Sequence, residues 1–145
     1  MTTCYVDTSA LAKRYLNEAR SGEVDEFLAE QSLLLVTSLT RAEMRSLLAR
    51  RRRERDLDAG LEGRVFATFL DDIRQGHLVE HPLSGAMLDG AVNLIGQLPA
   101  FPLRTLDALH IAAAQQLGAE RLATADAVMR DAAAELGIAT SFFGG

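Results

Sequence analysis

Four acidic residues, Asp7, Glu43, Asp107 and Asp126, stand where a fold could gather them at one site. Asp7 and Asp126 each follow a short apolar run typical of a strand, and Glu43 and Asp107 each fall in the first turn of an expected helix. Carboxylates that gather without lysine or histidine partners repel one another, and they stay ionised at neutral pH only beside a bound cation. If the chain brings these residues together, metal-ion chemistry is expected.

The available ligand types narrow the choice of metal. Carboxylate oxygens prefer hard ions such as Mg2+ or Mn2+, and the chain lacks the set of cysteine and histidine ligands that a zinc site uses. One or two such ions lower the pKa of a bound water and stabilise both the attacking and the leaving oxygen of a phosphodiester. The implied reaction is hydrolytic cleavage of a nucleic-acid backbone.

Each acid also has a purely structural explanation. The spacing from Thr40 to Glu43 matches a capping box, Asp7 and Asp126 can cap helices, and Asp107 complements a helix dipole. For any one acid taken alone, the structural explanation is favoured. Hydroxyl side chains accompany the acids at Thr8, Ser9, Thr37, Ser38 and Thr124. Because the structural explanation gives no reason for this combination, the acids taken together favour a functional site.

The elements that would position these acids alternate between strand and helix along the chain. Strands are expected at residues 4–6, 33–37, 78–79, 122–123 and 138–141. Helices are expected at residues 9–16, after Gly22, at 40–55, at 61–73, after Ser84, at 105–117 and between Asp126 and Gly137. The alternation predicts a single domain over residues 1–145, a three-layer α/β/α fold with a central parallel sheet of four to five strands. The helices at 40–55 and 61–73 are expected to form a helical hairpin.

The parallel sheet predicts where a site would lie. Ligands of open α/β sheets bind outside the carboxyl ends of the strands. Asp7, Glu43 and Asp126 map to that edge from their positions alone. Asp107 follows a loop, so its place at the edge depends on the resemblance described below.

Charge is unevenly distributed over an acidic chain. The net charge of -5 argues weakly against a general nucleic-acid coat, but seven arginines fall between residues 41 and 55. The run Arg50, Arg51, Arg52 and Arg53 is either the solvated end of a helix or a patch that binds phosphates or a protein partner. Both interpretations stay open at this point.

The remaining bulk properties concern the compartment. A chain of 145 residues with 48% hydrophobic residues can bury a core without disulfides, and its single cysteine, Cys4, has no partner. The N-terminus does not resemble a signal peptide, and no apolar stretch approaches membrane-spanning length. A cytoplasmic protein that does not contact membranes is expected.

Four segments of the chain together resemble a known family. They occur in order and span nearly the whole sequence: Tyr5–Leu11, Leu39–Glu43, Leu103–His110 and Leu122–Asp126. These segments are similar to the four signature segments of PIN-domain ribonucleases, and the size is that of the stand-alone VapC-type toxins of type II (VapBC) toxin–antitoxin systems.

The resemblance implies a role for each acid. Asp7, Glu43, Asp107 and Asp126 would hold Mg2+ or Mn2+, with Asp7 and Asp107 as direct ligands and the other two bound directly or through water. Thr8, Ser9 and Thr124 would orient carboxylates or water. His110, one turn after Asp107, is expected to pack or orient a ligand rather than act as a general base. The resemblance further implies an RNA substrate, a homodimer and a cognate VapB-type antitoxin.

Other α/β proteins with aspartates at strand ends are alternatives. A phosphorylation-receiver domain would need a lysine late in the sheet, whereas Lys13 lies on the first helix. An aspartyl-phosphate phosphatase would need a second acid where Ser9 stands. Within the PIN fold, the alternatives are a nuclease outside a toxin–antitoxin system and a binding module for RNA or protein that does not cleave.

Overall fold

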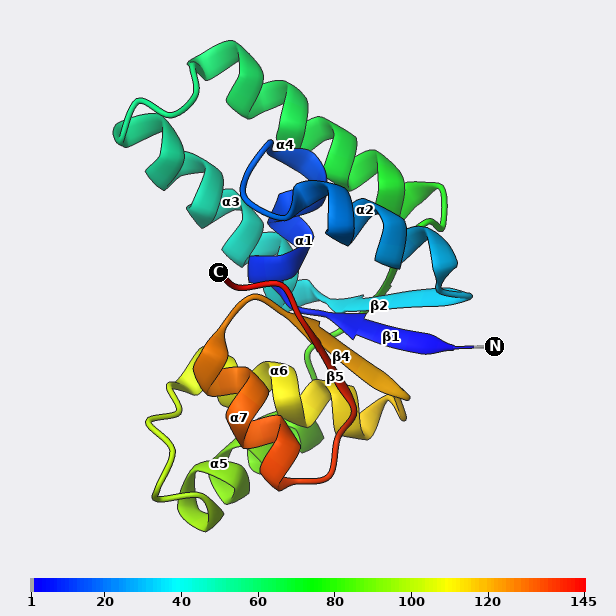
Figure 1. The fold of residues 1–145 in the computed structure, drawn as a ribbon, viewed down its shortest axis with the longest axis vertical. Helices are drawn as coiled ribbons and strands as arrows, with labels where there is room; N and C mark the ends of the chain where they lie inside the picture. The colour runs from blue at the N-terminus through cyan, green and yellow to red at the C-terminus, as the bar shows by residue number, and fades with distance from the viewer. Residues whose placement is uncertain (1) are drawn as a thin grey trace.

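The computed structural model describes residues 2–145, and within them helices and strands alternate as expected. The strands are β1 (Thr3–Val6), β2 (Leu33–Thr37), β3 (Val79–His81), β4 (Arg121–Thr124) and β5 (Thr140–Phe142). The helices are α1 (Thr8–Tyr15), α2 (Ser21–Glu30), α3 (Ser38–Arg53), α4 (Ala59–Arg74), α5 (Gly85–Gln97), α6 (Thr105–Gln116) and α7 (Ala127–Glu135). The chain thus builds a strand–helix architecture around one sheet (Figure 1).

The five strands form one parallel sheet in the order β3-β2-β1-β4-β5. The chain builds outward from β1 to β3 and then returns to place β4 on the other side of β1. The carboxyl ends of β1 and β4 therefore form the switch point at which open parallel sheets bind ligands. The predicted parallel sheet of four to five strands is confirmed.

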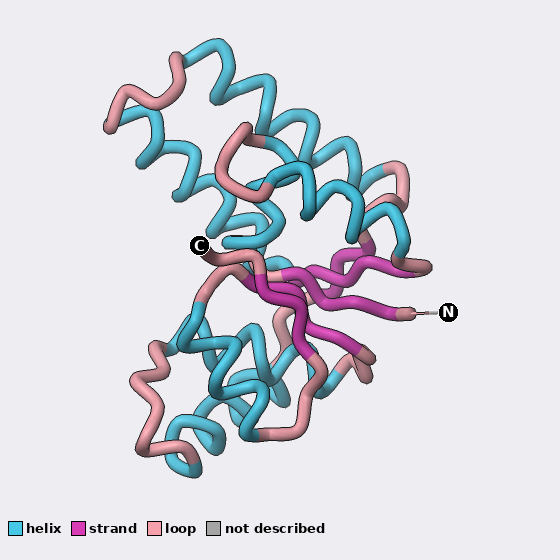
Figure 2. Tube along the Cα trace, viewed as in Figure 1, coloured by secondary structure: helices cyan, strands magenta, loops and turns pink. Residues whose placement is uncertain are grey.

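Helices cover both faces of the sheet (Figures 1 and 2). Helices α1 to α4 lie on one face and α5 to α7 on the other, which confirms the predicted three-layer arrangement. Side chains of a strand alternate between faces, so Cys4 and Val6 enter the core under α1 to α4 whereas Tyr5 enters the core with α6. Helices α3 and α4 form the expected hairpin.

Helix α6 is buried along most of its length. Its residues 107–114 are all buried, as expected of a helix that is apolar on all sides and lies inside a layer. Gly90 of α5 lets the two helices approach closely, because a Cβ at this position would stand 3.1 Å from the Cβ of Ala112. This close packing holds α6, whose first turn carries Asp107, against α5.

The start of helix α3 differs from the prediction. The helix begins at Ser38, and Thr37 is its N-cap, in a capping box that Thr37 forms with Thr40. The helix does not begin at Thr40 as predicted, so Glu43 lies in the second turn instead of the first, and the capping-box explanation for Glu43 does not apply. The error arises because a second hydroxyl stands three residues before Thr40, and this earlier pair fits the end of β2. The Glu43 side chain is thus free of a capping role.

No helix within residues 2–145 combines the length and the apolar character that crossing a membrane requires.

Candidate active site

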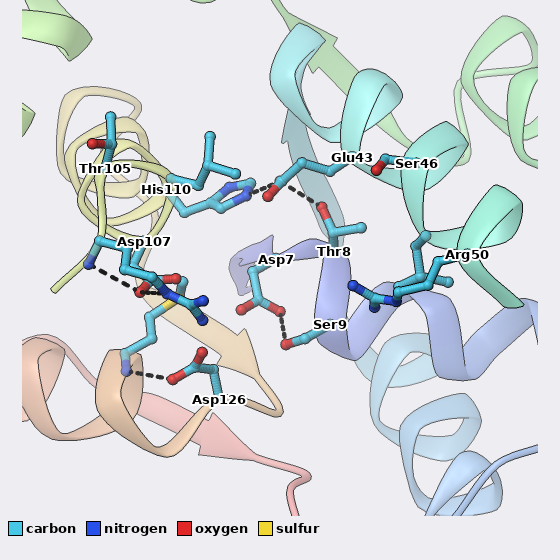
Figure 3. Close-up of a pocket in the computed structure, with 14 residues that line it drawn as sticks. Asp7, Thr8, Ser9, Glu43, Ser46, Arg50, Thr105, Asp107, His110 and Asp126 are labelled. Carbon is cyan, nitrogen blue, oxygen red and sulfur yellow. Dashed lines mark hydrogen bonds and ion pairs between the residues drawn. The ribbon is translucent and has the colours of Figure 1, made fainter. Parts of the chain in front are cut away.

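A cavity of about 550 Å³ opens at the carboxyl edge of the sheet, beside the switch point. All four acids predicted from the sequence line it, together with the predicted hydroxyls of Thr8 and Ser9 (Figure 3). Asp7 follows β1, Glu43 stands on α3, Asp107 lies in the first turn of α6 and Asp126 caps α7. Four separate elements therefore bring one carboxylate each to a single cavity.

Asp7 combines a structural role with a place in the cavity. Its Oδ1 caps α1 by accepting from the Ala10 amide at 2.9 Å and from the Ser9 hydroxyl at 2.7 Å, and its Oδ2 accepts from the Thr124 hydroxyl at 2.5 Å. The side chain is only 2% exposed, and this burial raises the pKa of Asp7. The hydrogen bonds and the nearby His110 oppose the rise. An ionised Asp7 is thus costly unless a cation shares the cavity.

Two hydroxyls join the end of β1 to the end of β4. Thr124 donates to Asp7 and accepts from the backbone amide of Asp126 at 2.9 Å. Ser9 likewise donates to Asp7 and accepts from the backbone amide of Ala125 at 2.9 Å. Each hydroxyl therefore fixes one oxygen of Asp7 relative to the neighbouring strand, which is an orienting geometry.

Glu43 is held through a single oxygen. Its Oε1 accepts from the Thr8 hydroxyl at 2.8 Å and is hydrogen-bonded to Nε2 of His110. Burial raises the pKa of Glu43, but the hydrogen bond and charge of His110 together with the Thr8 hydroxyl outweigh burial, so the pKa lies below its usual range. Glu43 is therefore an anion at neutral pH.

Asp107 and Asp126 face the cavity from the side opposite Glu43 (Figure 3). Asp107 accepts from the backbone amide of Arg104 at 3.3 Å, and Asp126 accepts from the backbone amide of Met129 at 3.0 Å. Burial raises the pKa of Asp107, and the neighbouring negative charge of Asp126 adds to the effect. The Arg104 guanidinium, 3.8 Å from the Asp107 carboxylate, opposes this in part.

The carboxylates keep oxygen atoms free for a ligand. Among residues 2–145, no hydrogen bond involves Oε2 of Glu43, Oδ1 of Asp107 or Oδ2 of Asp126. In that same part of the chain, no three acidic, histidine or cysteine side chains stand close enough together to hold a metal ion without moving. Mg2+ keeps several of its own waters and needs only one or two direct carboxylates, so these free carboxylate oxygens fit such an ion.

The four arginines of the predicted run have different surroundings in the structure. Arg50 lines the cavity, whereas Arg51 bonds to Glu18 of the α1–α2 connection. Arg52 and Arg53 are exposed on the surface of the helix end, and Arg52 lies 3.6 Å from Glu62. The structure therefore brings one of the four arginines to the acids and leaves three away from them.

Sequence reasoning missed several residues that line the cavity. Ser46 stands between Glu43 and Arg50 on α3, and this spacing of three and four residues puts all three on one helical face. That periodicity could have separated Arg50 from the rest of the run. Arg104 and Leu106 precede Asp107 and also line the cavity; they belong to the segment Leu103–His110 that resembles the family, but the sequence analysis gave neither of them a role.

Comparison with known proteins gives the chain a set of relatives. A family model described as the PIN domain matches residues 4–135. Ribonuclease VapC46 of Mycobacterium tuberculosis is 37% identical over 142 residues, which cover 96% of each chain.

Solved structures with little sequence identity share the fold. VapC20 of M. tuberculosis, a toxin that cleaves the sarcin–ricin loop, superposes with a TM-score of 0.70 at 17% identity, covering 89% of this chain and 94% of that one. FitAcB of Neisseria gonorrhoeae gives 0.69 at 16% identity, covering 94% and 95%. VapBC2 of Rickettsia felis, bound to a DNA fragment from its promoter, gives 0.66 at 14% identity, covering 97% and 98%.

Proposed function

The chain belongs to the PIN-domain family, and on this basis we propose that it is a metal-dependent endoribonuclease that acts as the toxin of a toxin–antitoxin pair. The relative at 37% identity, which matches nearly end to end, is named a ribonuclease. The structural neighbours include a toxin that cleaves the sarcin–ricin loop and complexes of toxin with antitoxin. These names support the RNA substrate and the antitoxin partner of the proposal.

One observation carries the proposed chemistry: four carboxylates from four elements line one cavity. No lysine lines that cavity within residues 2–145, and Arg50 and Arg104 are its arginines. An acidic wall is a poor surface for an RNA phosphate unless a cation lies between them. The arrangement therefore supports hydrolysis assisted by a divalent cation over simple binding.

The residues have separate tasks in this proposal. Asp7 and Asp107 would bind Mg2+ or Mn2+ directly, and Glu43 and Asp126 would bind it directly or through water. When bound, such an ion lowers the pKa of a water molecule and stabilises the charge that develops on the phosphodiester. Ser9 and Thr124 keep Asp7 oriented by the hydrogen bonds described above.

Arginine would contribute to substrate binding from one wall. Arg50 is exposed at the cavity, and within residues 2–145 no acidic side chain forms an ion pair with it. A guanidinium in that situation is available to bind a phosphate of the RNA backbone near the cleaved bond. An antitoxin that covers the cavity would compete for the same group.

A homodimer belongs to the same proposal. Three apolar residues of α5, Leu88, Val92 and Ile95, are exposed at positions that share one face of the helix. An exposed apolar stripe of this kind supports association with a second copy.

The deciding experiment measures cleavage of total cellular RNA by the purified protein in Mg2+ or Mn2+. Wild type is compared with Asp7→Asn, with a chelator control, and with Asp58→Asn as a matched variant. Asp58 caps α4 as Asp7 caps α1, since it accepts from the Leu61 amide at 2.8 Å, but it lies away from the cavity. We expect discrete RNA fragments from wild type and Asp58→Asn, and none from Asp7→Asn or with chelator.

Two other outcomes would favour a different function for this PIN-domain protein. If wild type binds Mn2+ and RNA but releases no fragments, the chain is a PIN-fold binding module. If it cleaves RNA but binds no antitoxin encoded beside its own gene, it is a PIN nuclease outside a toxin–antitoxin system.

A further inference from the structure

A chain of buried hydrogen bonds runs from the sheet to the cavity. The Oη of Tyr5 lies 2.7 Å from Nδ1 of His110 and 3.3 Å from the hydroxyl of Thr37, and Nε2 of His110 is hydrogen-bonded to Oε1 of Glu43. Tyr5 and Thr37 are fully buried, and His110 is 2% exposed. Polar groups buried to this extent are costly unless each has a partner, so the chain is a fixed part of the fold.

The direction of the hydrogen bond between His110 and Glu43 follows from its acceptor. An ionised Glu43 can only accept, so Nε2 of His110 carries a proton and donates. The Nδ1 atom accepts from the Tyr5 hydroxyl when the ring is neutral and donates to it when the ring is protonated, so the hydrogen bond to Tyr5 holds the ring in either state. Burial raises the pKa of Tyr5, so the phenol keeps its proton. The Thr37 hydroxyl can then donate to Tyr5.

This arrangement leaves Glu43 with one satisfied and one free oxygen. Oε1 receives the Thr8 hydroxyl as well as His110, whereas Oε2 has no hydrogen bond within residues 2–145. Tyr5 and His110 therefore influence the site only through the carboxylate of Glu43, which their hydrogen bonds hold in place. Neither residue needs to touch substrate for its loss to change the site.

We propose that Tyr5 and His110 are positioning residues, in which the Tyr5 hydroxyl fixes the orientation of the His110 ring and His110 holds Glu43 so that Oε2 remains available to the cavity. The inference rests on the proposed function for the task that Glu43 performs. The hydrogen-bond partner on one ring nitrogen fixes how the other nitrogen is aimed, and such partners commonly orient the ligands of a metal site.

The alternative is a tyrosine that is merely well packed, and the chain offers a control for it. Tyr15 is the second of the two tyrosines, and its hydroxyl donates to Asp72 at 2.5 Å, between α1 and α4. Neither Tyr15 nor Asp72 lines the cavity. Tyr5→Phe and Tyr15→Phe therefore remove the same atom, from a buried hydrogen bond that leads to the site and from a part-buried one that does not.

The experiment compares these two variants by three measurements: kcat and KM for RNA cleavage, the Kd for Mn2+ by calorimetry, and the 15N resonances of the histidine rings. We expect Tyr5→Phe to lower kcat and weaken Mn2+ binding about tenfold with KM for RNA unchanged, the size of effect usual for groups that orient metal ligands. Of the three histidines, His110 alone should change its ring 15N resonances. Tyr15→Phe should lower Tm only.

A second pair of variants covers the case in which Tyr5→Phe folds poorly. His110→Gln keeps an amide donor for Glu43, whereas His110→Leu offers none, so Gln should retain more of the Mn2+ affinity. The inference is overturned if Tyr5→Phe matches Tyr15→Phe in Mn2+ affinity and ring resonances, or if the Gln and Leu variants bind Mn2+ equally. If wild type cleaves no RNA, the proposed function fails, whereas the Mn2+ and NMR measurements still decide the role of Tyr5.

Discussion

Acidic side chains have different neighbours in two regions of the molecule, the α3–α4 hairpin and the carboxyl edge of the sheet. In the hairpin, Glu62 is 4% exposed and lies 3.1 Å from Arg45 and 3.6 Å from Arg52. At the edge, Asp7 is equally buried, but among residues 2–145 it has hydroxyl and amide donors and no ion pair with arginine or lysine.

The difference shows how to separate structural charge from functional charge. A buried carboxylate is stable when a cation of the protein neutralises it, and Glu62 has that cation permanently. At the edge, Asp7 and Asp126 form no ion pair with arginine or lysine within residues 2–145, and Asp107 has only the exposed Arg104 at 3.8 Å. Burial raises the pKa of both Asp7 and Asp107. The hairpin therefore uses its acid for stability, whereas the edge keeps negative charge that an external cation can use.

The largest effect is expected from Glu43→Gln. The substitution removes the charge while keeping the shape, so the hydrogen bonds from Thr8 and His110 to Oε1 can persist. Cleavage of RNA should fall by more than about 100-fold, because even the groups that orient metal ligands are typically worth 10–100-fold. Steady-state kinetics with a defined RNA measures this, and a variant with more than a tenth of the wild-type kcat would remove Glu43 from the proposed site.

The same substitution at Glu62, on the neighbouring helix α4, should lower stability and leave cleavage unchanged. Glu62→Gln loses the charge that Arg45 and Arg52 face, and we expect the free energy of unfolding to fall by about 1–3 kcal/mol. Since Glu62 does not line the cavity, kcat should not change. Urea unfolding beside the kinetic assay provides the test. A Glu62→Gln protein that is as stable as wild type but inactive would reverse the comparison.

Much of this contrast could be predicted from the sequence, for physical reasons. The strands of a parallel sheet are short apolar runs, and an acid directly after such a run, as at Asp7 and Asp126, must lie at the carboxyl edge. What the sequence could not predict were partners set by tertiary packing. Nothing local distinguishes Glu62 from Glu43, since each is a glutamate near the start of a helix, and only the fold gives one arginines and the other a histidine.

The same limit explains the remaining errors and omissions. Thr37 and Thr40 are both reasonable capping residues, and the end of β2 decides between them. Tyr5 in a strand is typical of a core residue, and its hydroxyl gains a role only because α6 brings His110 to it. Local patterns thus located Asp7, Glu43 and Asp126, the family resemblance located Asp107, and packing determined what holds them.

A smaller effect is expected from the arginines, and it tests how far the RNA-binding surface extends along α3. Arg50→Ala should raise KM for RNA about fivefold and make cleavage less sensitive to salt, because one phosphate contact is lost. Arg53→Ala, three residues further along the same helix and outside the cavity, should leave KM unchanged and serves as the control. Equal effects of the two variants would mean that the helix end attracts RNA by general charge alone.

The smallest effect is expected in the pH dependence of stability, where two tendencies partly cancel. Without metal, the raised pKa values of Asp7 and Asp107 mean that the folded state holds protons more tightly than the unfolded state, so their contribution to stability falls as pH rises above about 4. Glu43, whose pKa is lowered, contributes stability above about pH 4 that is lost as pH falls through its folded pKa. The net slope should therefore be shallow.

Mn2+ should change this balance in one direction. The ion binds the ionised carboxylates, so it should raise Tm more at about pH 7 than at about pH 5, by about 2–4 °C for each kcal/mol of added stability. Scanning calorimetry of wild type and Asp7→Asn at both pH values measures the effect, with Asp58→Asn as the matched cap variant. Asp7→Asn should lose most of the Mn2+ dependence and Asp58→Asn none of it. If Mn2+ raises Tm equally at both pH values in all three proteins, the ion binds elsewhere, and the carboxyl edge is not the cation site that its unneutralised charge suggests.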